Sequence, residues 1–198
     1  MSSKPLSILI SGAGIAGSSL ALMLARNPSF KLKPIITLIE RSPVPRTTGQ
    51  AIDIRGAAVK VIRKIGLEQK IRDMHTSETG IAWVNTKGER IAQFDASGNP
   101  DKQSYATSEF EILRGDLAKL IVDELDAAKD HTSINVVYGE SIKSLDEQED
   151  GVAVGFTNGK VEAQKFDIVV SADGMSSTTR PMMFPDTGTQ DCVKPWGW

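Results

Sequence analysis

The chain opens with apolar positions that follow first the pattern of a buried strand and then the pattern of a helix. The run 6–10 is short and rich in branched residues, which predicts a buried β-strand. Residues 15–26 are rich in alanine and leucine and predict a helix, which the Asn-Pro pair after them would end. A second apolar run, 34–39, closes on Glu40. The pattern therefore predicts a βαβ unit at the start of the chain.

Helical spacing of apolar residues returns twice later in the chain. It predicts an amphipathic helix over 57–71, which Gly66 ends early or divides in two. It also predicts a helix that starts within 111–117 and runs to about Lys129, with Arg114 preceding its first turn.

Strand patterns lie between and after these helices. Residues 79–95 predict an antiparallel hairpin with its turn at 85–88, and 134–138 predict a further strand. Residues 151–156 alternate and lead to an Asn-Gly pair, a hairpin signal whose return strand would include Val161 and Ala163. The run 166–171 is apolar enough to be a strand buried on both faces.

The loop of the first βαβ unit has the dinucleotide spacing G-x-G-x-x-G, in the run Gly12-Ala13-Gly14-Ile15-Ala16-Gly17. The first glycine would permit a tight turn, the second would let a pyrophosphate approach the backbone, and the third would let the helix pack closely. A diphosphate would then lie on the N–H groups at the positive end of the helix. Three glycines at this spacing also occur by chance, but the strand–loop–helix–strand–acid context favours nucleotide binding.

Glu40, at the end of the second strand, is the acid of this pattern. A carboxylate there would accept hydrogen bonds from a ribose diol and would repel a 2′-phosphate. The bound adenosine is therefore expected to lack a 2′-phosphate.

Composition narrows the class of protein and the compartment. The 198 residues are 40% hydrophobic and 24% charged, which is ordinary for a soluble globular protein. The formal net charge of -2 gives no indication of a nucleic-acid partner. The single cysteine cannot form an internal disulfide, no run approaches the about 20 apolar residues of a membrane helix, and no cleavable signal peptide is recognised. We therefore expect a cytoplasmic protein without a membrane partner.

For several polar residues the sequence allows more than one role. The loop 41–56 holds two prolines and two glycines, and is either a solvated loop or a cover over a cofactor in which Arg41 and other arginines face phosphates. Within it, residues 50–54 alternate between polar and apolar, which is the pattern of a short strand. Arg114 stands at the end of a helix where a cation is not favoured, which fits either a ligand contact or an exposed side chain. Asp173 follows the last predicted strand, where open α/β sheets bind ligands, although an Asp-Gly turn without a ligand is the simpler interpretation. The two histidines have no partners at metal-ligand spacing, so neither a metal site nor a catalytic residue is predicted.

Taken together, these residues resemble the class A flavin monooxygenases, the FAD-dependent aromatic hydroxylases of the para-hydroxybenzoate hydroxylase type. The fingerprint with Glu40 corresponds to the part that binds the ADP of FAD, and 112–117 is similar to the family's R-x-x-L element, whose arginine would be Arg114. Ala172-Asp173-Gly174, with the serines and arginine after it, resembles the D-G motif. The segment 49–54 is similar to the family's segment beside the flavin ring. That match adds three cofactor-contact candidates: Arg46, Gly49 and Asp53.

The resemblance implies a fold as well as an activity. The fold would be α/β, a Rossmann-like FAD-binding domain whose parallel sheet carries helices and an antiparallel β-meander, with part of a β-rich substrate domain. Residues 1–75 and 109–185 would form the FAD-binding domain, 76–108 a substrate-domain hairpin, and 186–198 an irregular tail. The activity would be hydroxylation of a small aromatic, polyketide or terpenoid-type substrate with O2, FAD and either NADPH or NADH. Arg114 would stabilise negative charge near the flavin, and Asp173 would help to position the cofactor.

The sequence also departs from these enzymes. They are much longer, and their later half supplies a G-D motif for FAD that is not found in this chain. The chain is therefore interpreted as the front half of such an enzyme: a truncated product, a fragment, or a subunit that a second polypeptide or oligomer completes. Two alternatives remain, namely a non-catalytic pseudoenzyme or partner subunit, and an NAD-dependent oxidoreductase, which the hairpins fit poorly.

Overall fold

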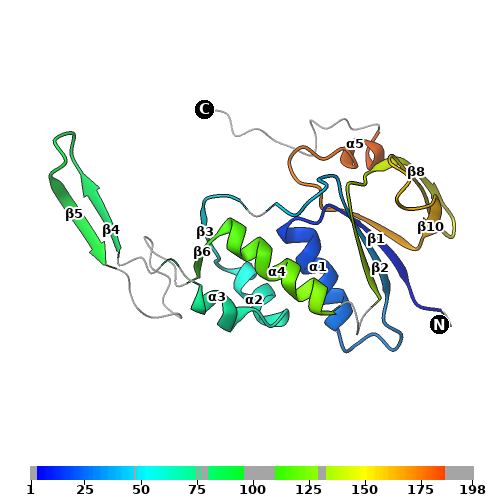
Figure 1. Cartoon of the computed structure of the whole chain (residues 1–198), viewed down its shortest axis with the longest axis horizontal. Coiled ribbons are helices and arrows are strands. Elements are labelled where there is room, and N and C mark those ends of the chain that lie inside the picture. Colours follow the sequence, from blue (N-terminus) through cyan, green and yellow to red (C-terminus); the bar gives the residue numbers. More distant parts are fainter. Residues whose placement is uncertain are drawn as a thin grey trace. The chain divides into compact units, whose positions relative to one another are not determined.

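The computed structural model describes residues 4–46, 48–74, 76, 80–95, 110–128 and 133–185 (Figure 1). The chain divides into two compact units, which are described separately. The first comprises Met1–Arg46 with Ile121–Trp198, and the second comprises Thr47–Leu120. No helix in the described ranges is both long enough and apolar enough to cross a membrane.

The first unit is built on the predicted βαβ unit. Its first strand and helix are β1 (Ser7–Ser11) and α1 (Ile15–Arg26), followed by β2 (Ile35–Glu40). In the described residues, β1 and β2 belong to a parallel sheet of strand order β11-β1-β2-β7, completed by β7 (Ile134–Tyr138) and β11 (Ile168–Ser171). This confirms the predicted Rossmann-like α/β architecture.

The strands of this sheet end level with one another. Ser11 pairs with Ile39 on one side and with Ser171 on the other, and Glu40 pairs with Tyr138. The carboxyl ends of four parallel strands therefore lie along one edge, which is where open α/β sheets bind ligands.

Both faces of the parallel sheet carry a core. On one face α1 buries Ala21 and Leu22. The other face packs against an antiparallel sheet of order β10-β9-β8, through a cluster in which Leu9 meets Val154 and Phe166. The antiparallel strands are β8 (Ile142–Gln148), β9 (Gly151–Phe156) and β10 (Gln164–Phe166).

The predicted hairpin after residue 151 is wrong in two details. The neighbour of β9 that precedes it in sequence, β8, was not predicted, because Ile142 and Leu145 are its only apolar residues and they do not alternate with period two. The return strand β10 begins at Gln164 and so excludes Val161 and Ala163. The Asn-Gly pair lies in a longer loop whose backbone is held by side-chain contacts instead of by a tight turn.

The predicted strand 166–171 is also corrected. Phe166 ends antiparallel β10, and parallel β11 begins at Ile168. Ile168 is 43% exposed, so β11 is not buried on both faces. In the described sheet β11 is an edge strand, which explains the exposure. A short helix, α5 (Arg180–Met183), follows it.

The second unit contains the helices and hairpin that the sequence predicts. The helix pattern is divided at Gly66, which has φ 76°, into α2 (Ala57–Lys64) and α3 (Glu68–Asp73). The hairpin is formed by β4 (Gly80–Val84) and β5 (Arg90–Asp95). The assignment of 76–108 to a substrate domain stays a prediction, and the tail 186–198 lies outside the described residues.

Only one strand of an antiparallel pair in the second unit was predicted. The short strand β3 (Ala51–Asp53), expected within 50–54, pairs with β6 (Glu111–Leu113), which was not predicted. After β6 the chain enters α4 (Arg114–Ala128), so Arg114 is the first residue of the helix and does not precede it.

Candidate functional site

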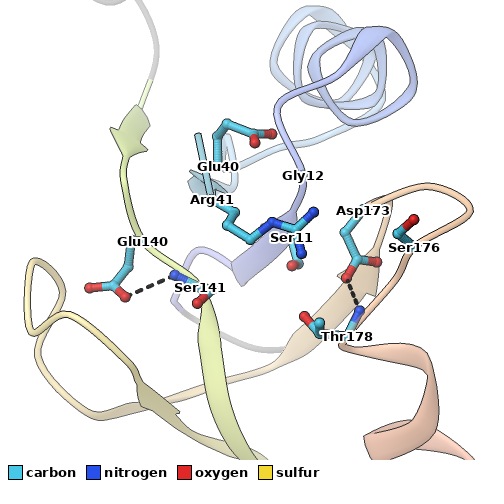
Figure 2. A pocket seen from close by; sticks show the side chains of 9 residues that line it. All are labelled: Ser11, Gly12, Glu40, Arg41, Glu140, Ser141, Asp173, Ser176 and Thr178. Atoms are coloured by element: carbon cyan, nitrogen blue, oxygen red, sulfur yellow. Dashed lines mark hydrogen bonds between the residues drawn. The ribbon is translucent and has the colours of Figure 1, made fainter. Parts of the chain in front are cut away.

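A pocket lies at the carboxyl edge of the parallel sheet in the first unit (Figure 2). Its volume is about 40 Å³, which is enough for a few water molecules, so a larger ligand would extend beyond it. The lining residues come from the ends of β1, β2 and β11 and from the turn after β7: Ser11, Gly12, Glu40, Arg41, Glu140, Ser141, Asp173, Ser176 and Thr178. Four sequence-predicted candidates, Gly12, Glu40, Arg41 and Asp173, thus meet at one site.

The three glycines of the fingerprint have different surroundings. A Cβ on Gly12, whose φ is +104°, would lie 2.5 Å from the carbonyl oxygen of Ala172. A Cβ on Gly17 would lie 2.0 Å from the carbonyl oxygen of Gly12. A Cβ on Gly14 would meet no described atom within 4 Å. Packing of the chain therefore requires the first and third glycines, whereas the second borders open space.

The helix that starts behind this loop is open at its amino end. Gly14 is the N-cap residue of α1, and among the described residues no side chain caps the helix and no acidic residue lies in its first turn. The first turn includes Ile15 and Ala16, and Ala16 is exposed. Because the first N–H groups of a helix lack intrahelical acceptors, this end suits an anion.

Glu40 is half-buried and tied to the loop. Its Oε2 accepts a hydrogen bond from the main-chain N–H of Ala13 at 3.0 Å, and its Oε1 accepts one from the N–H of Ser42 at 2.8 Å. Each carboxylate oxygen has two acceptor positions, so each keeps one for a ligand hydroxyl. Arg41 is exposed and lines the pocket beside it, whereas Arg46 is exposed and is not among the lining residues.

Asp173 lies two residues after β11 and organises the loop around itself. Its Oδ1 accepts hydrogen bonds from the hydroxyls of Ser171 and Ser177, each at 2.6 Å, and its Oδ2 accepts from the N–H groups of Thr178 and Thr179, each at 3.1 Å. Burial raises the pKa of Asp173, but the bonds from Ser171, Ser177 and Thr179 outweigh burial and lower the pKa to about 2. The four donors fill the acceptor positions of this carboxylate. A direct hydrogen bond to a ligand would therefore displace one of them.

Glu140 is a pocket residue that sequence reasoning missed. It is 0% exposed, and its carboxylate accepts four main-chain N–H bonds: from Ser141 (2.8 Å), Thr157 (3.1 Å) and Asn158 (2.9 Å) to Oε1, and from Lys160 (2.8 Å) to Oε2. Burial raises the pKa of Glu140, but these backbone donors lower it below the usual range. One sequence signal existed, because Glu140 follows the predicted strand 134–138 just as Glu40 and Asp173 come at the ends of their predicted strands.

The remaining candidates lie together in the second unit. The pairing of β3 with β6 brings Gly49 next to Arg114: a Cβ on Gly49 would lie 3.0 Å from Cβ and Cδ of Arg114. The N–H of Arg114 donates to the carbonyl of Gln50 at 3.0 Å. Asp53 forms an ion pair of 2.7 Å with Arg55. The structure thus joins the two sequence segments that carry these candidates.

In the described residues, the parallel sheet, the glycine loop, the acid that ends β2 and the antiparallel sheet packed on one face define an α/β nucleotide-binding protein. Comparison with known proteins narrows this class. The family model described as FAD binding domain matches residues 6–198, and the chain therefore belongs to this family.

The relatives of the chain are considerably longer than it is. An FAD-dependent monooxygenase of Sarocladium schorii is 34% identical over 180 residues, which are 90% of this chain and 39% of the relative. A flavin-dependent monooxygenase of a Phoma species is 34% identical over 189 residues, covering 91% of this chain and 42% of the relative. The crystal structure of tetracycline destructase Tet(55) matches with a TM-score of 0.71 and 30% identity, over 94% of this chain and 43% of that chain. The chain therefore spans about two fifths of the length of these three proteins.

Proposed function

We propose that the pocket binds the adenosine diphosphate part of FAD. The diphosphate lies over Gly14 and the first turn of α1, and the adenosine ribose is held by Glu40. The observation that carries the proposal is the contrast between the glycines: Gly12 and Gly17 are closed off by the chain's own backbone, whereas open space lies in front of Gly14, at the start of the helix.

The polar groups around the pocket fit this ligand. The uncapped first turn of α1 offers N–H donors and the positive end of a helix dipole to a diphosphate. Arg41, which lines the pocket, adds a positive charge that can approach a phosphate oxygen. Each oxygen of Glu40 retains one acceptor position for the two hydroxyls of a ribose.

At the level of the reaction, we propose that the chain is the cofactor-binding portion of an FAD-dependent monooxygenase that uses NADPH or NADH. The relatives at 34% identity, which are named FAD- or flavin-dependent monooxygenases, support this assignment. FAD, when bound, supplies the electron transfer and oxygen activation that protein side chains cannot. The protein's part is to bind and orient, and the substrate proposed is a small aromatic, polyketide or terpenoid-type molecule. Arg46, Gly49, Asp53 and Arg114 are proposed contacts of the flavin part, on the resemblance of their segments to those of the family.

A second candidate is nucleotide binding without turnover, as in a pseudoenzyme or partner subunit. The observation in its favour is that the chain spans only 39% and 42% of two monooxygenase relatives. The two candidates share the ADP pocket and differ in whether NADPH is oxidised.

The experiment that tests the pocket is a calorimetric titration of the chain with ADP and with 2′,5′-ADP. We expect ADP to bind and 2′,5′-ADP to bind about tenfold more weakly or not at all, because the Glu40 carboxylate repels a 2′-phosphate. Glu40→Gln keeps the shape of the side chain but removes its charge, so it should lose most of this discrimination. Absence of any ADP binding to a folded chain would refute the proposal.

A further inference from the structure

Glu140 lies where three segments of the first unit meet beside the pocket. It is in the turn after β7, and its own N–H donates to the carbonyl of Glu40 at 2.9 Å. The preceding N–H, of Gly139, donates to the carbonyl of Ser42 at 2.9 Å. These two bonds continue the pairing of β2 with β7 past its last ladder pair, Glu40 with Tyr138. The turn therefore holds the backbone on both sides of Arg41.

The third segment is the loop between β9 and β10. Its N–H groups at Thr157, Asn158 and Lys160 all donate to the Glu140 carboxylate. Two side chains of the same loop are also donors: Asn158 Nδ2 donates to the carbonyl of Gly139 at 3.1 Å, and Lys160 Nζ donates to the carbonyl of Tyr138, at the end of β7, at 2.7 Å. Main-chain and side-chain donors of the loop thus all bind acceptors on the turn and on the last residue of β7.

A carboxylate is the side chain this arrangement requires. Four main-chain donors converge on Glu140, and both of its oxygens act only as acceptors when it is ionised. Its burial would be costly without these partners, since an unpaired buried charge loses its hydration. A glutamine would offer one acceptor oxygen and would turn an NH2 group toward at least one N–H donor.

We propose that Glu140 is a positioning residue of the nucleotide site. It clamps the turn after β7 against the loop 157–160. The N–H groups of that turn bind the carbonyls of Glu40 and Ser42 and so hold the end of β2 in place. The Glu40 carboxylate is thereby kept where it accepts the N–H groups of Ala13 and Ser42 and faces the pocket. This inference rests on the proposed function, because it assigns Glu140 to the binding of the same adenosine.

The test compares Glu140→Gln with Asp167→Asn, a matched control at the other end of the sheet. Asp167, like Glu140, is a carboxylate that anchors the backbone: it accepts hydrogen bonds from the N–H and the hydroxyl of Ser7, at 2.7 and 2.9 Å. These bonds lie at the start of β1, and Asp167 does not line the pocket. Both variants remove one carboxylate charge and weaken a hydrogen-bonded anchor. We expect Glu140→Gln to lower the affinity for ADP about fivefold or more, and Asp167→Asn to leave it within about twofold of the wild type.

A second readout separates positioning from stability. Amide hydrogen exchange of Ala13 and Ser42 reports directly on the two bonds to Glu40. Under conditions where both variants are folded, we expect these two amides to exchange faster in Glu140→Gln and at wild-type rates in Asp167→Asn. If Glu140→Gln does not fold, Asn158→Ala removes one bond of the same clamp, and its expected effect is a loss of ADP affinity of about twofold to fivefold.

The outcomes are distinguishable from failure of the proposed function. Wild-type protein that binds no ADP refutes the pocket assignment, whereas the exchange of Ala13 and Ser42 still tests the clamp. Unchanged exchange and affinity in Glu140→Gln, or in Asn158→Ala should that variant be needed, overturn the inference. An equal loss of ADP affinity in Asp167→Asn also overturns it, because the effect would then be a general loss of stability.

Discussion

The main-chain N–H of Ala13 donates a hydrogen bond of 3.0 Å to Oε2 of Glu40. This bond joins the glycine loop after β1 to the end of β2, so the proposed diphosphate and ribose contacts are connected before a ligand arrives. A site whose parts are already fixed loses less conformational entropy on binding.

The first prediction concerns the glycines of the loop. Gly14→Val should lose no more than about 1 kcal/mol of stability, because its Cβ enters open space at a φ of -74° and the loss comes from the N-cap preference for glycine over valine. It should nevertheless lower the affinity for ADP by about tenfold or more, because the side chain would occupy the proposed path of the diphosphate. Thermal unfolding followed by calorimetric titration measures both effects.

Gly17→Ala is the control for that prediction. Its Cβ would lie 2.0 Å from the carbonyl oxygen of Gly12, so the loop and helix must separate. We expect a loss of stability of about 2 kcal/mol or more, as for other changes that overpack a well-packed interior. If Gly14→Val were instead the less stable variant, the open space in front of Gly14 would not exist in solution.

The second prediction concerns acid stability and Asp173. The pKa of Asp173 in the folded protein is about 2, below its value of 3.8 without these contacts. A lowered pKa means that the carboxylate stabilises the fold above pH 3.8 and that this contribution is lost as the pH falls toward 2. Its size is about 1 to 2 kcal/mol, allowing for the partial exposure of the group.

Asp173→Asn isolates this contribution from those of the other carboxylates. The free energy of unfolding, measured in urea, should be lower in the variant than in the wild type at pH 6, and the difference should shrink toward zero near pH 2. Glu140 and Asp167 also have lowered pKa values, but they are present in both proteins and cancel in the comparison. A difference that stayed constant from pH 6 to 2 would show that the carboxylate charge is not what holds the loop 174–179.

The parts of the fold that the sequence predicts well are those set by local patterns. The boundaries of α1 follow from the glycine loop before it and the Asn-Pro pair after it, and the division of the next helix follows from Gly66. The strand β8 was missed because Ile142 and Leu145 are its only apolar residues and they do not alternate with period two. The strand β6 is only three residues long, too short to show a period.

The residues of the site fall into the same two groups, those that a local pattern identifies and those that depend on contacts distant in sequence. Glu40 was predicted because a spacing of residues from the glycine loop identifies it. The contacts of Asp173 were not, because its donors lie up to six residues later in a loop whose conformation the hydrogen bonds themselves create. Glu140 was missed because three of its donors lie 17 to 20 residues away in sequence, on a loop whose return strand was itself misplaced. Non-local hydrogen bonds leave no periodic signal.

The third prediction concerns the 198-residue chain by itself. We expect it to bind FAD weakly and to show negligible flavin-dependent oxidation of NADPH, because it spans about two fifths of its monooxygenase relatives. The measurements are the absorbance of flavin that remains with the protein after gel filtration and the loss of NADPH absorbance at saturating FAD. Stoichiometric yellow protein would contradict the first expectation. A substrate-stimulated rate would contradict the second and would favour the enzyme over the pseudoenzyme.

The last prediction concerns Gly49 and Arg114 in the second unit. Gly49 has a φ of +151°, and a Cβ there would lie 3.0 Å from two carbons of the Arg114 side chain. Gly49→Ala therefore meets both backbone strain and crowding, and we expect it to cost about 2 to 3 kcal/mol of stability. Gly88→Ala is the matched control, since Gly88 has a φ of +80° but no described atom within 4 Å of its Cβ position, and it should cost only about 1 kcal/mol. Exchange of the Arg114 amide, which donates to Gln50, should accelerate in the Gly49 variant alone. Equal costs in the two variants would mean that Arg114 moves away freely, and that Gly49 does not fix its side chain.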